Sequence, residues 1–190
     1  MIHRRPFFCS FAGDGDPSGM IPARSEIPRE YTWDLEVVFP SAETWEESFR
    51  LLGEEMERLG GYNGRLFESP GTLLEFLKLE EGASERMGRL YAYAVMKSHE
   101  DTADAARQAR AERAGTLLAS YGAVLSFYRP EVLAAGADGV RAAIEGCPGL
   151  EMYRHHFDDL LRTAGHVLGL QEEEILARSG EIARAPENIF

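Results

Sequence analysis

The chain has 190 residues, of which 44% are apolar and 27% are charged, and its net charge at pH 7 is −12. A chain of this length can bury roughly 70% of the surface that it exposes when unfolded, which is enough for one globular core. The acidic charge argues against nucleic acid and anionic membrane as partners, because both recruit clusters of Lys and Arg. No stretch approaches the ~20 apolar residues that a membrane-spanning helix needs.

Residues 1–26 are rich in Gly, Pro and Asp and lack hydrophobic periodicity. This composition predicts a disordered tail, and a start codon placed too early is the alternative explanation. The apolar run after Arg4 and Arg5 is shorter than the core of a signal peptide. Cys9 and Cys147 lie far apart, in neither a metal-binding nor a redox spacing, which favours a reducing compartment. We therefore expect a cytoplasmic protein.

Residues 27–40 are expected to be extended, because two prolines bracket a pattern that is too irregular for a helix. A helix should follow to about Leu59. Ser41 stands at its N-cap position, and acidic residues in the first turns favour the helix dipole. The pair Gly60–Gly61 ends it. Apolar side chains recur every three to four residues and define one buried face: Trp45, Phe49, Leu52, Met56 and Leu59.

A second helix should begin after Ser69, with Pro70 at its first position. Gly82 either breaks this helix or only softens it. The buried stripe on both sides of Gly82 is predicted to continue to about Lys97 and to contain Leu73, Leu74, Leu77, Met87, Leu90, Tyr91, Ala94 and Val95.

Asp101 is predicted to cap a long helix that ends before Pro130. The first half of this helix, residues 102–116, is rich in Ala and Arg, so it either packs very closely or projects into solvent. The second half carries an apolar stripe of Leu117, Tyr121, Val124 and Tyr128. Shorter helices are expected at residues 130–135, 138–145, 149–163 and 170–185.

The predicted fold class is all-α. Every apolar pattern has a period near 3.6, and no segment alternates convincingly with a period of two. We expect a multi-helix lobe of antiparallel helical hairpins, preceded by the extended N-terminal segment.

One dipeptide imitates a zinc-peptidase motif. His99 and Glu100 begin like the HExxH helix, but Ala103 stands where the second His is required. Two His one turn apart on one helical face are essential to that site, so it cannot form here. A turn between two helices is the favoured interpretation of this dipeptide.

Other candidate residues also have simpler explanations. Three residues are spaced by four on one predicted helix: Glu151, His155 and Asp159. Two neighbouring members of this set could bind one metal ion. All three together cannot, because eight helical residues span about 12 Å, and a solvated face with salt bridges is favoured. For His166, near a helix end, a local hydrogen bond is favoured over a place beside a peptide cleft. Tyr91 and Tyr93 could line a peptide groove, although core packing is favoured. We therefore assign no catalytic, cofactor-binding or metal-binding residue to this chain.

Residues 31–41 read YTWDLEVVFPS, and Trp45 follows one helical turn later. This strip resembles the opening segment of the oligoendopeptidase F family, which are zinc metallopeptidases related to thimet oligopeptidase. The resemblance covers about Arg24 to Phe190, whereas residues 1–23 match nothing in the family and Gly169 replaces a helix-capping Ser. Further similar residues follow in the family's order and spacing: Ser69, Pro70, Leu73, Leu74, Leu90, Tyr91, Tyr93, Ala94, Glu100, Asp101, Thr102, Phe127, Pro130, Glu131, Tyr153, Leu160, Arg162, His166, Leu168, Glu173, Leu176, Ala177, Pro186, Asn188 and Phe190.

The resemblance implies that residues 27–190 are the helical N-terminal lobe of such a peptidase, with the catalytic HExxH domain absent. In the family, this lobe helps to roof a deep cleft that admits short peptides. The two His of HExxH and a downstream Glu hold one zinc ion, and the motif Glu serves as general base for the zinc-bound water. The expected partners are therefore the missing catalytic lobe and, in the full enzyme, short peptides. Alone, the chain should bind no zinc and hydrolyse no peptide.

Two alternatives remain beside this interpretation. The chain could be a stand-alone helical binding or adaptor module derived from the lobe, or a truncated reading frame without a separate role. The apolar ending Ile189–Phe190 favours a cut through continuous structure. Such a cut predicts a bare apolar face and self-association.

Overall fold

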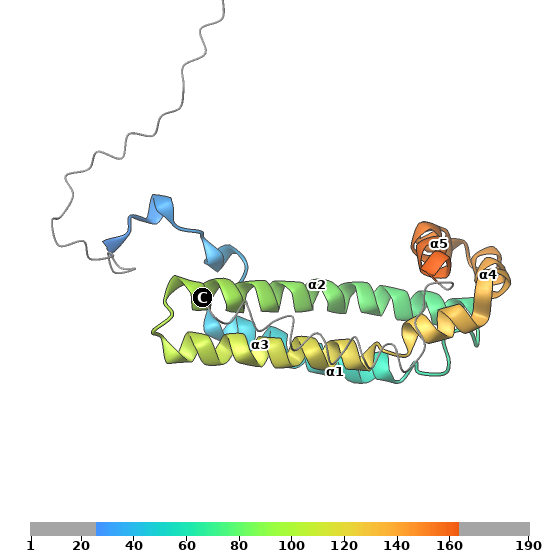
Figure 1. The fold of residues 1–190 in the computed structure, drawn as a ribbon, viewed down its shortest axis with the longest axis horizontal. Coiled ribbons are helices and arrows are strands. Elements are labelled where there is room, and N and C mark those ends of the chain that lie inside the picture. Colours follow the sequence, from blue (N-terminus) through green and yellow to red (C-terminus); the bar gives the residue numbers. More distant parts are fainter. Residues whose placement is uncertain (1–25, 164–190) are drawn as a thin grey trace, which may run out of the picture.

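The computed structural model describes residues 26–163, and these form helices and turns without any strand. Helix α2 (Pro70–Glu100) is the longest and lies antiparallel to both α1 (Ala42–Gly60) and α3 (Ala105–Val124) (Figure 1). The shorter elements α4 (Tyr128–Gly146), η4 (Pro148–Tyr153) and α5 (Arg154–Arg162) cover the end of the bundle where α2 begins. The predicted all-α fold class is confirmed. The predictions about Cys9, His166 and the helix at 170–185 lie outside the described residues.

The leading segment, residues 27–40, lies at the other end of the bundle, beside the end of α2 (Figure 1). The sequence predicts an extended segment, and the structure adds two short 3-10 turns, η2 (Arg29–Tyr31) and η3 (Leu35–Val37). Each turn is closed by its own backbone hydrogen bond, from Thr32 N to Arg29 O and from Val38 N to Leu35 O. The segment is thus irregular but locally ordered.

Helices α1 and α2 begin where the sequence predicts. The Ser41 hydroxyl accepts from Thr44 N, while the Thr44 hydroxyl accepts from Ser41 N, which completes a capping box. The Ser69 hydroxyl accepts from Thr72 N at 3.1 Å, and Pro70 follows at the first helical position. Gly82 does not break α2, because one helical glycine costs only about 1 kcal/mol and buried side chains flank it.

The start of α3 differs from the prediction. Asp101 does not cap this helix; its carboxylate accepts from Ala103 N in the connecting turn. Asp104 is the N-cap instead, accepting from Ala106 N and Arg107 N at 2.9 and 3.1 Å. Helix α2 extends to Glu100, whose carboxylate pairs with Lys97 at 3.3 Å and with Arg107 of α3 at 3.0 Å. This charge cluster joins the end of α2 to the first turn of α3.

The Ala- and Arg-rich half of α3 packs closely on the bundle. Ala114 is fully buried. The guanidinium groups of Arg110 and Arg113 lie 5.6 and 5.3 Å from the ring centre of Trp45, which is fully buried beneath them. Arg113 also donates to both carboxylate oxygens of Glu46, at 2.7 and 2.8 Å, and this lowers the pKa of Glu46. Of the two alternatives, close packing is therefore correct for this half.

Most of the predicted apolar stripes face the core. One exception is Tyr91, which is 39% exposed, whereas its neighbour Tyr93 is buried. The largest fully buried side chains are Trp45, Phe76, Phe157, Leu52, Leu59, Leu66, Leu73, Leu90, Leu150 and Val132.

Helix α4 changes direction at Gly136, as the two predicted helices at 130–135 and 138–145 require. Gly136 has φ 66° and ψ −178°, a conformation that is essentially restricted to glycine. We expect Gly136→Ala to lower the free energy of unfolding by about 1–3 kcal/mol, as measured by chemical denaturation.

The matched control for this substitution is Gly82→Ala, in the helical interior of α2. An added Cβ would meet no atom within 4 Å at either position, so steric crowding affects neither variant. Gly82→Ala should raise stability by about 0.5–1 kcal/mol, because alanine favours a helix. Equal stability of Gly136→Ala and wild type would contradict the assignment of backbone strain.

Candidate functional site: an aromatic surface on the leading segment

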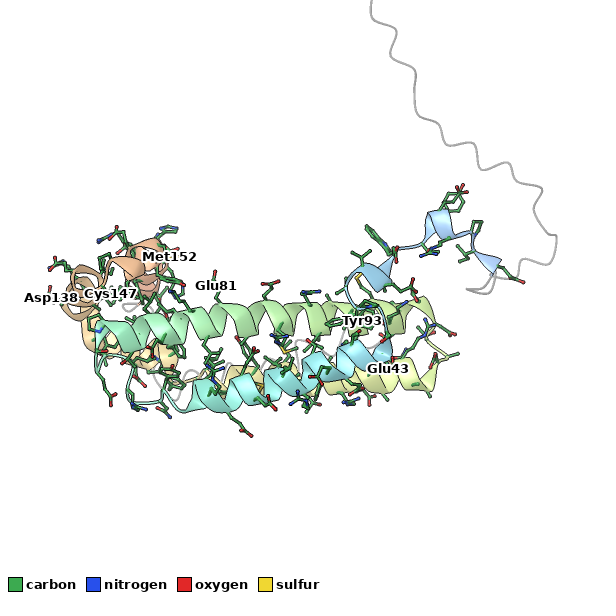
Figure 2. The ribbon with its side chains drawn as sticks, turned by 180° about the vertical axis from the view of Figure 1, so that it is seen from behind. Glu43, Glu81, Tyr93, Asp138, Cys147 and Met152 are labelled. Atoms are coloured by element: carbon green, nitrogen blue, oxygen red, sulfur yellow. The ribbon has the colours of Figure 1, made fainter. Side chains whose placement is uncertain are left out.

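The leading segment is anchored to α2 through two apolar side chains. Leu35 and Phe39 are only 5% and 6% exposed. The ring of Phe39 meets the ring of Tyr93 edge to face, with 5.3 Å between their centres, and Figure 2 shows Tyr93 beside this segment. Arg89 of α2 donates to the carbonyl of Val38 at 3.0 Å, and its guanidinium lies 5.6 Å from the ring centre of Phe39. These contacts fix the position of the segment on the bundle.

Other apolar side chains of the same segment are exposed. Tyr31, Trp33 and Val37 are 76%, 80% and 78% exposed, respectively. We call these three side chains the aromatic surface. Beside it lies a hollow between the leading segment and the last turns of α2, which is lined by Ile27, Tyr31, Trp33, Leu35, Met96 and His99. The surface therefore combines protruding side chains with a neighbouring depression.

The charges next to the aromatic surface are paired with one another. A guanidinium nitrogen of Arg29 lies 3.4 Å from the carboxylate of Glu36 and 3.6 Å from that of Asp34. All three side chains are exposed, so the pairs contribute little to stability. One cation faces two carboxylates here and Glu30 adds a third, so the segment keeps a small net negative charge around its apolar side chains.

His99 and Glu100 are the last two residues of α2, so the predicted turn between helices begins only after them, at Asp101. His99 is exposed and borders the hollow, whereas Glu100 belongs to the charge cluster with Lys97 and Arg107. The sequence-based hypothesis that the Tyr91–Tyr93 region packs in the core holds for Tyr93 only.

The other candidate residues lie at the far end of the bundle. Glu151 belongs to η4 and pairs with Arg154 at 2.7 Å. His155 and Asp159 lie on α5, with 3.4 Å between Nε2 and Oδ2. This is the predicted solvated face with salt bridges.

Within residues 26–163, no group of three or more His, Cys, Asp or Glu side chains is arranged to hold a metal ion. The donor set in this part of the chain therefore does not fit the zinc site that the family resemblance implies. None of the helices in the described part of the chain is both long enough and apolar enough to cross a membrane.

Comparisons with known proteins agree on one family. The sequence model of the family described as Oligopeptidase F matches residues 131–190. The chain is 34% identical over 173 residues to oligopeptidase PepF of Bacillus subtilis, an alignment that covers 91% of this chain and 26% of PepF. The chain belongs to the oligoendopeptidase F family. It is also 35% identical over 167 residues to group B oligopeptidase PepB of Streptococcus agalactiae, covering 88% of this chain and 28% of PepB.

A solved structure of the oligoendopeptidase F family supports the assignment. The crystal structure of oligoendopeptidase-F from Enterococcus faecium superposes with a TM-score of 0.65 and 26% identity, covering 77% of this chain and 28% of that one. The chain thus spans between a quarter and a third of the length of these relatives. The family resemblance inferred from residues 31–41 and the later motifs is confirmed, and this chain corresponds to the family's N-terminal region.

Sequence reasoning identified the residues of the aromatic surface but not their exposure. The spacing of the leading segment carries no signal for it. Its apolar residues recur every two positions and would share one face of an extended strand: Trp33, Leu35, Val37 and Phe39. In the structure, Leu35 and Phe39 are buried, whereas Trp33 and Val37 are exposed.

Proposed function

We propose that this chain serves as the N-terminal helical lobe of a zinc metallopeptidase that hydrolyses short peptides. Residues 27–190 form the lobe in this proposal, which helps to roof the substrate cleft and contributes no catalytic or zinc-binding residue. The proposal rests mainly on the 34% identity to PepF over 173 residues, a match that spans only 26% of that relative. It includes a cytoplasmic location, which the isolated cysteines favour.

The arrangement of the described helices supports a role in positioning another part of the peptidase. The bundle offers a long, rigid body with an exposed aromatic surface at one end. The residues that a zinc peptidase needs would come from the remaining part of the relatives' polypeptide. There, the metal would act as a Lewis acid and would lower the pKa of a bound water.

The proposal predicts different behaviour for the chain alone and in combination. Alone, it should contain no stoichiometric zinc by metal analysis and should not hydrolyse short fluorogenic peptides, because a catalytic zinc needs three protein ligands. Mixing it with a version of Bacillus subtilis PepF that lacks the matched region should raise the peptidase activity of that version. Stoichiometric zinc together with chelator-sensitive hydrolysis by the chain alone would overturn the proposal.

A stand-alone helical binding module is the alternative that the exposed aromatic surface also permits. In that case, the shortened PepF should gain no activity, and the chain should remain a monodisperse monomer that does not associate with it. The same mixing experiment therefore separates the two functions.

A further inference from the structure

The aromatic surface is held in place by the structure and is not a frayed end. Its residues alternate with Leu35 and Phe39, which are buried against α2. Arg89 holds the backbone between them through the carbonyl of Val38. Because the anchors fix the backbone of the segment, Trp33 and Val37 are exposed from an ordered stretch of chain. A segment whose backbone is ordered in this way loses little conformational entropy when a partner binds.

The concentration of apolar side chains at this place is unusual for the molecule. Among the described residues, the other large apolar side chains with substantial exposure are Tyr91, Leu118 and Met152, and they lie on three different elements. Tyr31, Trp33 and Val37 lie within seven residues. Two of them, Tyr31 and Trp33, also line the hollow beside the end of α2. Scattered apolar residues need no explanation, whereas a cluster with an exposed Trp and Tyr has the composition of an interface centre.

The charges indicate what kind of partner fits. Arg29 pairs with Asp34 and Glu36, and Glu30 is a further acidic residue, so a mildly acidic rim surrounds the apolar side chains. Interface centres are depleted in charged residues, and a complementary surface should therefore be apolar. The bare face predicted from the sequence could also lead to self-association, but a second copy is the poorer partner for this surface, because each copy carries a net charge of −12 and the two would repel each other.

The lengths of the relatives identify the partner. The chain matches 26% of PepF and 28% of PepB, so about three quarters of each relative's polypeptide lies outside the matched region. We infer that the aromatic surface docks on this remaining part of the peptidase polypeptide, with Trp33 at the centre of the contact. This inference rests on the proposed function and adds the surface through which the lobe is held.

Tryptophan fluorescence offers a direct test, because the chain has two tryptophans in opposite environments. Trp45 is fully buried and Trp33 is 80% exposed. Titration with PepF that lacks the matched region should shift the emission of Trp33 to shorter wavelength and protect it from acrylamide quenching. Comparing wild type with Trp33→Phe isolates this signal. Trp33→Ala should raise the dissociation constant by at least about tenfold, which is typical of a central aromatic residue.

The matched control is Met152→Ala. Met152 is 71% exposed and lies at the opposite end of the bundle, as Figure 2 shows. This variant should bind as tightly as wild type. Trp33→Ala should keep the circular dichroism spectrum and melting temperature of wild type, because the side chain it removes is mostly in solvent. A loss of affinity can then be assigned to the surface rather than to unfolding.

The possible outcomes separate the inference from the proposed function. If wild type does not bind the shortened PepF, the proposed function and the docking surface both fail. If wild type and Trp33→Ala bind equally well, only the docking surface is wrong. A blue shift that depends on the concentration of the chain alone would identify a second copy as the occupant and would also overturn the inference. As a check within one polypeptide, Trp33 should be shielded from acrylamide when the chain replaces the matched region of full-length PepF.

Discussion

Replacing Trp45 with alanine should lower the free energy of unfolding by about 3–5 kcal/mol, the largest effect that we expect from a single substitution in the described part. Trp45 is fully buried, and its Nε1 donates to the carbonyl of Leu90 at 3.1 Å. Its ring also supports the guanidinium groups of Arg110 and Arg113. The substitution leaves a large cavity where α1, α2 and α3 meet and removes the cation–π contacts. Urea denaturation followed by circular dichroism measures the loss.

Two variants serve as controls for Trp45→Ala. Trp45→Phe keeps an aromatic ring beneath Arg113 but loses the hydrogen bond to Leu90, so its destabilisation should be smaller. Trp33→Ala removes the same side-chain type from an exposed position and should change stability by less than about 0.5 kcal/mol. If Trp45→Ala and Trp33→Ala unfolded at the same urea concentration, the central position of Trp45 in the core would be contradicted.

Replacing Glu131 with alanine should lower the free energy of unfolding by about 1–3 kcal/mol, a loss similar to that expected for Gly136→Ala. Glu131 lies in the first turn of α4, and its carboxylate accepts from the backbone N–H groups of Gly64 and Leu66. It thereby holds the loop between α1 and α2, in which Gly64 has φ 77° and Leu66 is fully buried. Truncation leaves the backbone N–H of buried Leu66 without its acceptor, whereas the N–H of exposed Gly64 can bind water. For a buried donor, the cost of losing its acceptor exceeds the gain from the bond itself.

Glu131→Gln and Glu57→Ala complete this test. The amide of Gln keeps one acceptor oxygen but turns an NH2 group toward a backbone donor, so it should recover only part of the loss. Glu57 is an exposed residue of α1, and its replacement by alanine should be nearly neutral. Thermal unfolding of the four proteins should rank Glu131→Ala lowest. A neutral result for Glu131→Ala would show that the loop is held by other contacts.

Much of the bundle could be predicted from the sequence because its helix starts have strong local signals. Ser41 and the Ser69–Pro70 pair each act through side chain to backbone contacts within three residues, which a sequence pattern contains completely. The start of α3 was missed because Asp101 and Asp104 are equally good caps. The choice between them depends on the ion pairs of Glu100 with Lys97 and Arg107, which extend α2 by one turn.

The aromatic residues of α2 illustrate a second limit of sequence reasoning. Tyr91 and Tyr93 both lie near the predicted apolar stripe. Tyr93 is buried because Phe39 of the leading segment packs against it, and Tyr91 has no such cover. The path of the leading segment depends on tertiary contacts with Arg89 and Tyr93, which no periodicity encodes. For the same reason, the exposure of Trp33 could be recognised only in the structure.

The family assignment, by contrast, could be made from the sequence, because it depends on the order of short motifs along the chain. The function of the described region cannot be derived from side-chain chemistry in the same way. In the described region, no three His, Cys, Asp or Glu side chains are arranged to hold a metal ion. The most distinctive surface of this region is apolar. A lobe that positions another domain acts through shape and contact. Its proposed role therefore has to be tested by joining it to that domain.

The most direct test of the central claim is the peptidase activity of a chimera in which this chain replaces the matched quarter of Bacillus subtilis PepF. The account predicts that the chimera hydrolyses short peptides, leaves folded proteins intact, and is more active than PepF lacking that quarter. A chimera that folds and binds zinc yet is no more active on short peptides than the shortened PepF would contradict it.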